Sequence, residues 1–271
     1  LKFIRDNAKK PFFAYLPITI PHAAMQCPEE DVAPFRKKFP QFEDKIGKYG
    51  HGTKVRNPVA AFAGMMTRMD RGVGQVLDLL DELKIADNTL VLFSSDNGPH
   101  HEGGHQPGFF NSNGPLKGHK RDLYEGGIRV PLIAYWPGRV KAGSVNDHIC
   151  AHWDLMPTFC ELAKTSTPAH TDGISYVPAL TGGKQKKHDY LYWEFHSYGN
   201  AQAIRMGDWK AIRLKVKNNP NAPIQLYNLK QDIGETKNIA AAHPNVVKRI
   251  APLFKEAHAP SERFPLFAKK R

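Results

Sequence analysis

Apolar residues follow a helical spacing near the start of the chain and gather into short runs elsewhere. From residue 62 to residue 83 the apolar positions alternate steps of four and three, a spacing that stacks side chains on one face of a helix. Those positions are Phe62, Met66, Met69, Val73, Val76, Leu80 and Leu83. The pattern predicts one long amphipathic helix, whose two methionines we assign to its packed face rather than to a ligand site.

Short apolar runs on either side of this helix predict strands. Residues 11–20 (PFFAYLPITI) are typical of a buried strand, although Pro17 interrupts the run. Residues 90–93 and residues 130–136 (VPLIAYW) predict two more strands, and a helix is predicted over residues 154–164. This alternation is typical of an α/β fold in which a mostly parallel or mixed sheet is flanked by helices.

The pattern changes after about Thr181. Four short strand candidates follow, separated by turns rich in glycine, aspartate and asparagine, and a helix is predicted near the end. The strands cover residues 190–195, 203–206, 209–214 and 225–229, with a hairpin turn at Gly207-Asp208, and the helix covers residues 245–255. We therefore expect residues 1–182 to form part of an α/β domain and residues 183–271 a small antiparallel subdomain with a helix.

The apolar run Thr89–Phe93 ends abruptly in Ser-Ser-Asp-Asn-Gly. In open α/β sheets, ligands bind at the carboxyl ends of the strands. The side chains of Asp96 and Asn97 offer the hard oxygen donors that Ca²⁺ prefers. An Asn-Gly turn after a strand explains the same residues without a metal, so this stretch alone leaves both interpretations open.

The loop that follows, residues 98–127, contains eight glycines and four histidines. His100, His101 and His105 suggest a zinc site, but they lie in a glycine-rich loop without cysteine or a helical pair of histidines. We interpret them instead as surface histidines or as histidines at the rim of a substrate site.

Lysine and arginine number 38 against 26 aspartates and glutamates, which gives a formal net charge of +12. The basic residues are scattered and no recognised nucleic-acid-binding motif accompanies them, so we expect no nucleic-acid partner; a surface that attracts an acidic substrate, or a merely solvated one, explains the charge better. The three cysteines make no disulfide framework. No apolar run predicts a transmembrane segment. The start at Leu1, without a signal-peptide pattern, suggests an internal start and leaves localisation open.

Six groups of residues together carry a resemblance. They are Pro11–Tyr15 with Pro21–Ala23, Met69-Asp70 with Val73-Gly74, Ser95–Gly98, Asn113–Lys120, Tyr124–Pro131, and Leu226–Leu229 with Asp232, Glu235 and Asn238. In this order they resemble the C-terminal portion of the formylglycine-dependent, arylsulfatase-like sulfatases of the alkaline phosphatase superfamily. The resemblance covers nearly the whole chain, and the ordered set is far more specific than any single motif.

The resemblance implies roles for particular residues. Asp96 and Asn97 match two metal ligands, which in the family usually hold Ca²⁺. Lys120 matches a lysine that binds the sulfate group, and His22 matches a histidine that contacts a sulfate oxygen and assists the leaving group. His100 is a further candidate on the substrate side. The resemblance also implies a sulfated small molecule or glycan as partner and a periplasmic or secreted location; without it, Lys120 is a surface lysine and His22 caps a loop.

The family's nucleophile, a formylglycine made in a Cys/Ser-x-Pro-x-Arg motif, has no counterpart in this sequence, where Ser166–His170 comes nearest but ends in histidine. The paired acidic ligands of the family's first strand are missing too. We therefore expect a fragment that is inactive alone and whose partner is the missing N-terminal half. We expect it to hold Ca²⁺ weakly or not at all. We also expect it to self-associate, because this would cover exposed sheet edges. Glu125 and Arg129 are expected to hold the Gly126-Gly127 turn.

Two other functions fit the same residues. A phosphoesterase or phosphonate hydrolase of the same superfamily shares the metal-bearing strand. A non-catalytic module that binds sulfated glycans would explain the basic charge and the missing nucleophile.

Overall fold

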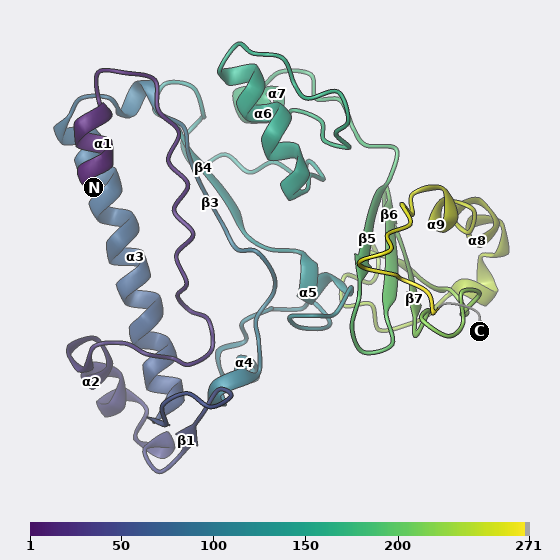
Figure 1. The fold of residues 1–271 in the computed structure, drawn as a ribbon, viewed down its shortest axis with the longest axis horizontal. Coiled ribbons are helices and arrows are strands. Elements are labelled where there is room, and N and C mark those ends of the chain that lie inside the picture. Colours follow the sequence, from purple (N-terminus) through teal and green to yellow (C-terminus); the bar gives the residue numbers. More distant parts are fainter. Residues whose placement is uncertain (269–271) are drawn as a thin grey trace. The chain divides into compact units, whose positions relative to one another are not determined.

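The computed structural model of the chain describes residues 1–268. Figure 1 traces the chain, which divides into two compact units. The first unit comprises Leu1–Leu92, Pro99–Ser112 and Tyr135–Gly138, and the second comprises Phe93–Gly98, Asn113–Ala134 and the chain from Arg139 onward. No helix of the described residues is long and apolar enough to cross a membrane.

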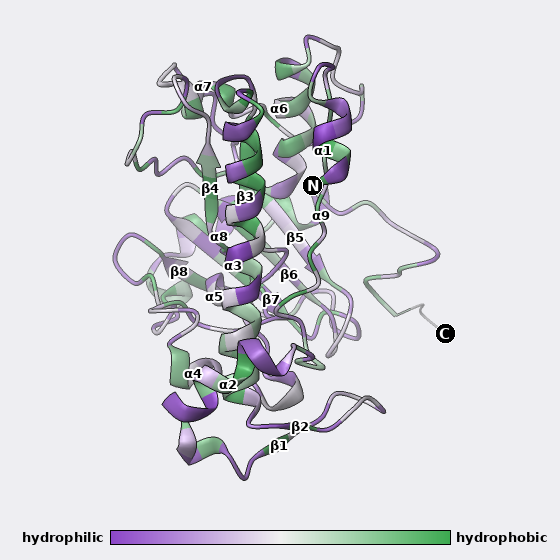
Figure 2. Ribbon diagram, turned by 90° about the vertical axis from the view of Figure 1, so that its left-hand side faces the viewer, coloured by the Kyte–Doolittle hydropathy of each residue, from purple (hydrophilic) through white to green (hydrophobic). Residues whose placement is uncertain are grey.

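The first unit is built around α3 (Pro58–Glu82), the helix that the apolar spacing predicts. Figure 2 shows apolar and polar residues alternating along it. Near its start Ala60, Ala61 and Met65 pack against Val32 of α2 (Glu29–Lys38), and near its end Leu79 and Leu80 pack against Ile4 of α1 (Lys2–Asn7). Met66, assigned to the packed face, is 38% exposed, because the buried stripe runs one residue earlier along that turn.

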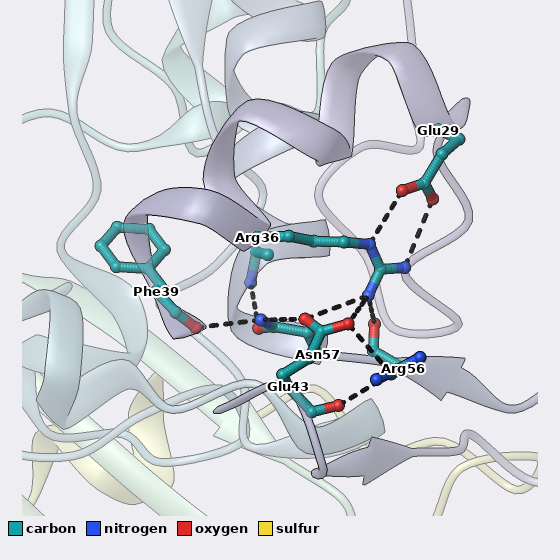
Figure 3. A network of polar contacts seen from close by, with 7 residues as sticks. Glu29, Arg36, Phe39, Glu43, Arg56 and Asn57 are labelled. Carbon is teal, nitrogen blue, oxygen red and sulfur yellow. Dashed lines mark hydrogen bonds and ion pairs between the residues drawn. The ribbon is translucent and has the colours of Figure 1, made fainter. Parts of the chain in front are cut away.

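A polar network fixes the entry to α3 (Figure 3). Asn57 is the N-cap, and its side-chain oxygen accepts from the Ala60 N–H at 3.0 Å while its amide nitrogen donates to Glu43 at 3.0 Å. Arg36 of α2 donates to Glu43 at 3.2 Å and to Glu29 at 2.9 Å. These bonds tie the short 3₁₀ turn η1 (Pro40–Phe42) and the hairpin β1 (Ile46–Gly47) and β2 (Val55–Arg56) to the two helices.

The prediction of a buried strand over residues 11–20 is wrong. That segment forms no strand, and Phe13, Tyr15, Leu16 and Ile18 are all exposed. Pro17 has no N–H to give to a neighbouring strand, and the Ile18 N–H turns back to the Leu16 carbonyl at 2.8 Å. The chain is therefore bent where an unbroken ladder would need it straight.

The predicted α/β class is confirmed, with the second and third strands close to their expected positions. β3 (Val91–Ser94) pairs with β4 (Leu132–Tyr135). The predicted helix over residues 154–164 is α6 (Leu155–Leu162). The remaining short elements are η2 (Ala86–Asn88), η3 (Glu102–Gly104), α4 (Pro107–Phe110), α5 (Glu125–Ile128), η4 (His152–Asp154), α7 (Val177–Thr181) and η5 (Ala240–Ala242).

The C-terminal antiparallel sheet is also confirmed. It runs in chain order through β5 (Leu191–Phe195), β6 (Ala201–Met206), β7 (Trp209–Leu214) and β8 (Gln225–Asn228). One face packs on Ile250 of α8 (Pro244–Ile250) and Phe254 of α9 (Leu253–Glu256), and the other packs on Leu123. The sequence predicts one helix over residues 245–255, where the structure has α8 and α9; the break falls at Pro252, which has no N–H to continue the helix.

Candidate metal and anion site

The end of β3 delivers Asp96 and Asn97 into a turn of the second unit. Ser94, the last residue of the strand, donates to the Pro131 carbonyl at 2.9 Å and so anchors the strand end beside β4. Ser95 donates to the carbonyl of Asn97 at 2.9 Å, which closes the turn. Asp96 is exposed and Asn97 half-buried, and the Asn97 amide lies 3.0 Å from the Asp96 carboxylate. The Asn97 amide nitrogen is the donor in this contact, so the two side chains lie side by side after the end of β3.

The next residue, Gly98, is packed against the double glycine of α5. Its N–H donates to the carbonyl of Gly127 at 2.9 Å. A Cβ on Gly98 would lie 1.8 Å from the carbonyl oxygen of Gly126, so only glycine fits there. The Asn-Gly pair is therefore more than a turn signal, because it brings the Asp96-Asn97 turn into backbone contact with α5.

The loop that carries Lys120 packs against the same two glycines, Gly126 and Gly127. The Gly126 N–H donates to the Lys117 carbonyl at 2.6 Å, and a Cβ on Gly127 would lie 2.5 Å from the His119 carbonyl oxygen. The Asn113 amide donates to the Gly118 carbonyl at 3.0 Å and holds the loop from its other side. The Lys120 side chain is half-buried, and its ammonium makes no hydrogen bond or ion pair within residues 1–268. It remains available to an anion.

Glu125, at the start of α5, is the centre of a buried ion cluster. Lys210 of β7 donates to one carboxylate oxygen at 2.7 Å, and Arg205 of β6 donates to the other at 3.3 Å. Arg129 lies 3.7 Å away. Burial raises the pKa of Glu125, but these cations outweigh burial and hold the pKa below its ordinary value. These contacts agree with the structural role predicted for Glu125 and Arg129, whereas Lys210 and Arg205 lie in no motif that would single them out.

Glu235 completes this cluster from the other side. Its carboxylate accepts the Glu125 N–H at 2.6 Å, and Lys117 donates to its backbone carbonyl at 3.1 Å. Glu235 is fully buried. Burial, resisted by the charge of Lys210, raises its pKa to about 7. The C-terminal motif that contains Glu235 therefore reaches the loops that carry Asp96, Asn97 and Lys120.

His22 and His100 lie together in the first unit. The His22 Nδ1 is 3.1 Å from the Ala23 carbonyl oxygen, and its ring meets the edge of Tyr49 at 5.5 Å between centroids. The His100 ring is 6.1 Å from that of His22, and its Nε2 is 3.1 Å from the Pro21 carbonyl oxygen. His100 thus holds the residue that precedes His22. Tyr49 was not singled out from the sequence, because its exposed hairpin carries no motif.

The other histidines of the loop differ in their surroundings. The His105 ring stacks on Phe62 of α3 at 3.8 Å between centroids and lies 5.2 Å from the His100 ring. His105 is buried and His101 exposed. His105 therefore belongs to the packing around α3.

The donor chemistry of the Asp96-Asn97 turn suits Ca²⁺ in kind and falls short in number. A carboxylate and an amide are the hard oxygen ligands that Ca²⁺ takes, but the ion prefers about six to eight of them. In the part of the chain that the structure describes, no group of three or more His, Cys, Asp or Glu side chains could hold a metal ion. Asp96 and Asn97 alone therefore supply fewer donors than a Ca²⁺ ion takes.

Comparisons with known proteins show which family the chain resembles. The sulfatase family model matches residues 1–165, and the model described as "N-sulphoglucosamine sulphohydrolase, C-terminal" matches residues 118–258. An N-acetylgalactosamine-6-O-sulfatase of Bacteroides thetaiotaomicron is 29% identical over 93% of this chain and 48% of its own length. Human steryl-sulfatase is 35% identical over 74% of this chain and 31% of its own length. The chain spans half or less of the length of these relatives.

The solved structure of Ps i-CgsB in complex with k-i-k-neocarrahexaose is similar in fold. Its TM-score to this chain is 0.77, with 32% sequence identity over 94% of this chain and 52% of that protein. The shared architecture therefore extends over nearly all of the present sequence.

Proposed function

The chain belongs to the sulfatase family, and on that premise we propose that it supplies the calcium-binding and sulfate-binding part of a sulfuric ester hydrolase. The observation that carries the proposal is the packing of two loops on Gly126-Gly127. One of them presents Asp96 and Asn97, and the other presents Lys120. Two oxygen donors for a cation and one unpaired ammonium are the groups that a sulfate ester needs for charge stabilisation.

Asp96 and Asn97 would hold Ca²⁺, which when bound supplies positive charge opposite the sulfate oxygens. Lys120 donates from its ammonium to a non-bridging sulfate oxygen, and its half-buried position strengthens that interaction relative to bulk water. With only two protein donors from this chain, we expect weak calcium binding, with a Kd of about 1 mM or higher.

His22 acts on the leaving group in this proposal. If Nδ1 carries the proton, the ring donates to the Ala23 carbonyl oxygen 3.1 Å away, and Nε2 is the nitrogen left for the chemistry. In its protonated form the imidazole gives a proton from Nε2 to the departing oxygen. His100 supports this role by holding the Pro21 carbonyl, one residue before His22.

The substrate we propose is a sulfated small molecule or glycan. A net charge of +12 suits an acidic polymer, and the neighbouring Ps i-CgsB structure contains a neocarrahexaose. A periplasmic or secreted location belongs to the same proposal. Because the sequence contains no Cys/Ser-x-Pro-x-Arg motif, we propose that the chain binds the ester without cleaving it alone.

Titration with inorganic sulfate in the presence of Ca²⁺ tests the anion site. We expect the 271-residue chain to bind sulfate saturably, and NMR of the backbone amides of residues 117–122 monitors this binding. Lys120→Ala should weaken that binding about tenfold or more, because it removes the unpaired ammonium. Lys184→Ala, at an exposed lysine of the same unit, is the matched control. Equal weakening in both variants would refute a site at Lys120.

A further inference from the structure

Glu125 and the metal-bearing turn are joined by a short backbone route. Glu125 begins α5, and the two residues after it are Gly126 and Gly127. Gly127 accepts the Gly98 N–H, and Gly98 directly follows Asn97. A displacement at the start of α5 therefore reaches the proposed calcium ligands through two glycines and one hydrogen bond.

The position of Glu125 is set by more than its ion pairs. Its side chain is held by Lys210 and Arg205, whereas its backbone N–H donates to the Glu235 carboxylate at 2.6 Å. Glu235 is 0% exposed and lies 110 residues further along the chain. Glu235 therefore holds the backbone of Glu125, the first residue of α5, whereas Lys210 and Arg205 hold its side chain.

The Glu235 carboxyl lies in surroundings that disfavour its charged form. Its second carboxylate oxygen, Oε1, is buried and has no hydrogen-bond partner within residues 1–268. The charged and titratable groups that face the carboxyl are Lys210 of β7, Arg205 of β6, Tyr227 of β8, Glu125 of α5 and Lys117. Burial raises its pKa to about 7. A protonation change near neutral pH thus alters how strongly the carboxyl accepts the Glu125 N–H.

We propose that Glu235 is a positioning residue for the metal-bearing turn: by anchoring the Glu125 N–H it fixes Gly126-Gly127 against Gly98 and so sets the placement of Asp96 and Asn97. The proposal deepens the function proposed above and rests on the metal role of that turn. Within residues 1–268, Glu235 makes no hydrogen bond to Asp96 or Asn97. Its effect travels through the backbone of α5.

NMR of the full chain, ¹⁵N-labelled and titrated from about pH 5 to about pH 9, tests the coupling. In the native chain the Gly98 amide shift should follow the titration of Glu235 with a midpoint near 7. In Glu235→Gln that component should vanish, whereas Glu161→Gln, at an exposed glutamate of the same unit, should retain it. A Gly98 amide that titrates unchanged in Glu235→Gln would overturn the proposal, because another group would then be responsible.

Hydrogen exchange gives a second readout that does not depend on pH titration. In Glu235→Leu the Gly98 amide should exchange about tenfold or more faster, while the Ile212 amide in β7 keeps its rate. Equal acceleration at both amides would show a general loss of stability and would contradict a positioning role.

Calcium titration of the same samples distinguishes a failure of the positioning role from a failure of the proposed calcium-binding function. Suppose that Ca²⁺ shifts the NMR signals of Asn97 in the native chain, but the Gly98 amide shift does not depend on Glu235. The positioning role then fails and the metal site stands. If Gly98 follows Glu235 but Ca²⁺ leaves Asn97 unchanged, the coupling exists without a metal site, and the positioning role as stated fails with the proposed function.

Discussion

Gly98 donates its backbone N–H to the carbonyl oxygen of Gly127 at 2.9 Å. This bond joins the turn that presents Asp96 and Asn97 to the α5 turn that also supports the Lys120 loop. Residues from distant parts of the chain converge there, since α5 is held in turn by Lys210 and Glu235. The proposed calcium and sulfate ligands therefore share one structural support.

Gly98→Ala should disrupt this support. The new Cβ would meet the Gly126 carbonyl at 1.8 Å, and the backbone shift that relieves the clash should cost about 1–3 kcal/mol of unfolding free energy. Urea denaturation measures the cost. The control is Gly72→Ala inside α3, where a Cβ meets nothing within 4 Å and alanine should stabilise by about 0.5–1 kcal/mol. Equal stabilities for both variants would contradict the close packing of Gly98.

Stability should fall as the pH rises from about 4 to about 7. The folded pKa of Glu235, about 7, lies above its unfolded value of about 4.3, so the folded chain keeps a proton that the unfolded chain has lost. The resulting stabilisation is complete below about pH 4 and disappears as the pH passes 7; over that window it amounts to about 4 kcal/mol. Glu235→Gln should remove this part of the pH dependence, as measured by urea denaturation at several pH values. An identical slope in the variant would contradict the raised pKa.

Lys210→Met should be strongly destabilising. The change leaves the buried Glu125 carboxylate without its nearest cation, 2.7 Å away, and loss of one partner of a buried pair costs about 3–5 kcal/mol. Adding Glu125→Gln should restore part of that loss, because no uncompensated charge then remains. Arg5→Met breaks an exposed ion pair of similar length and should leave the urea midpoint unchanged. Equal effects of the two single changes would argue against a buried cluster.

The sequence predicted those elements whose patterns are local. The spacing of α3 and the alternating runs of β5 to β8 can be recognised without a distant partner, because the order of apolar residues within each segment shows which face is buried. The strand expected over residues 11–20 failed for the complementary reason. Apolar content predicted burial there, but Pro17 bends the segment and a strand needs a neighbour to pair with.

The candidate site divides in the same way. Asp96, Asn97 and Lys120 stand out because they occupy recognisable motifs. Lys210 does not, because a lysine in an alternating strand is normally solvent-exposed, and only the antiparallel register that places it opposite Tyr227 carries it into the core. Its partner Glu125 is 85 residues away, a separation at which a single sequence holds no pairing signal.

The chain alone should not hydrolyse an aryl sulfate. It holds no Cys/Ser-x-Pro-x-Arg motif from which a formylglycine could be made, and the remaining ligands stabilise charge without forming a bond to sulfur. A chromogenic aryl sulfate with Ca²⁺ present should give no turnover above the buffer rate. Turnover that Lys120→Ala abolishes would mean that another nucleophile is present in the chain.

Calorimetry of aryl sulfate binding, with Ca²⁺ and then with a chelator, tests the shared calcium and sulfate site most directly. We expect Ca²⁺ to tighten binding by about tenfold or more in the native chain, because the cation and the ester charge attract one another across the site. Asp96→Ala should abolish that linkage, and Asp147→Ala, at an exposed aspartate of the same unit, should preserve it. Binding that is independent of Ca²⁺, or a linkage that survives in Asp96→Ala, would contradict a metal site at the end of β3.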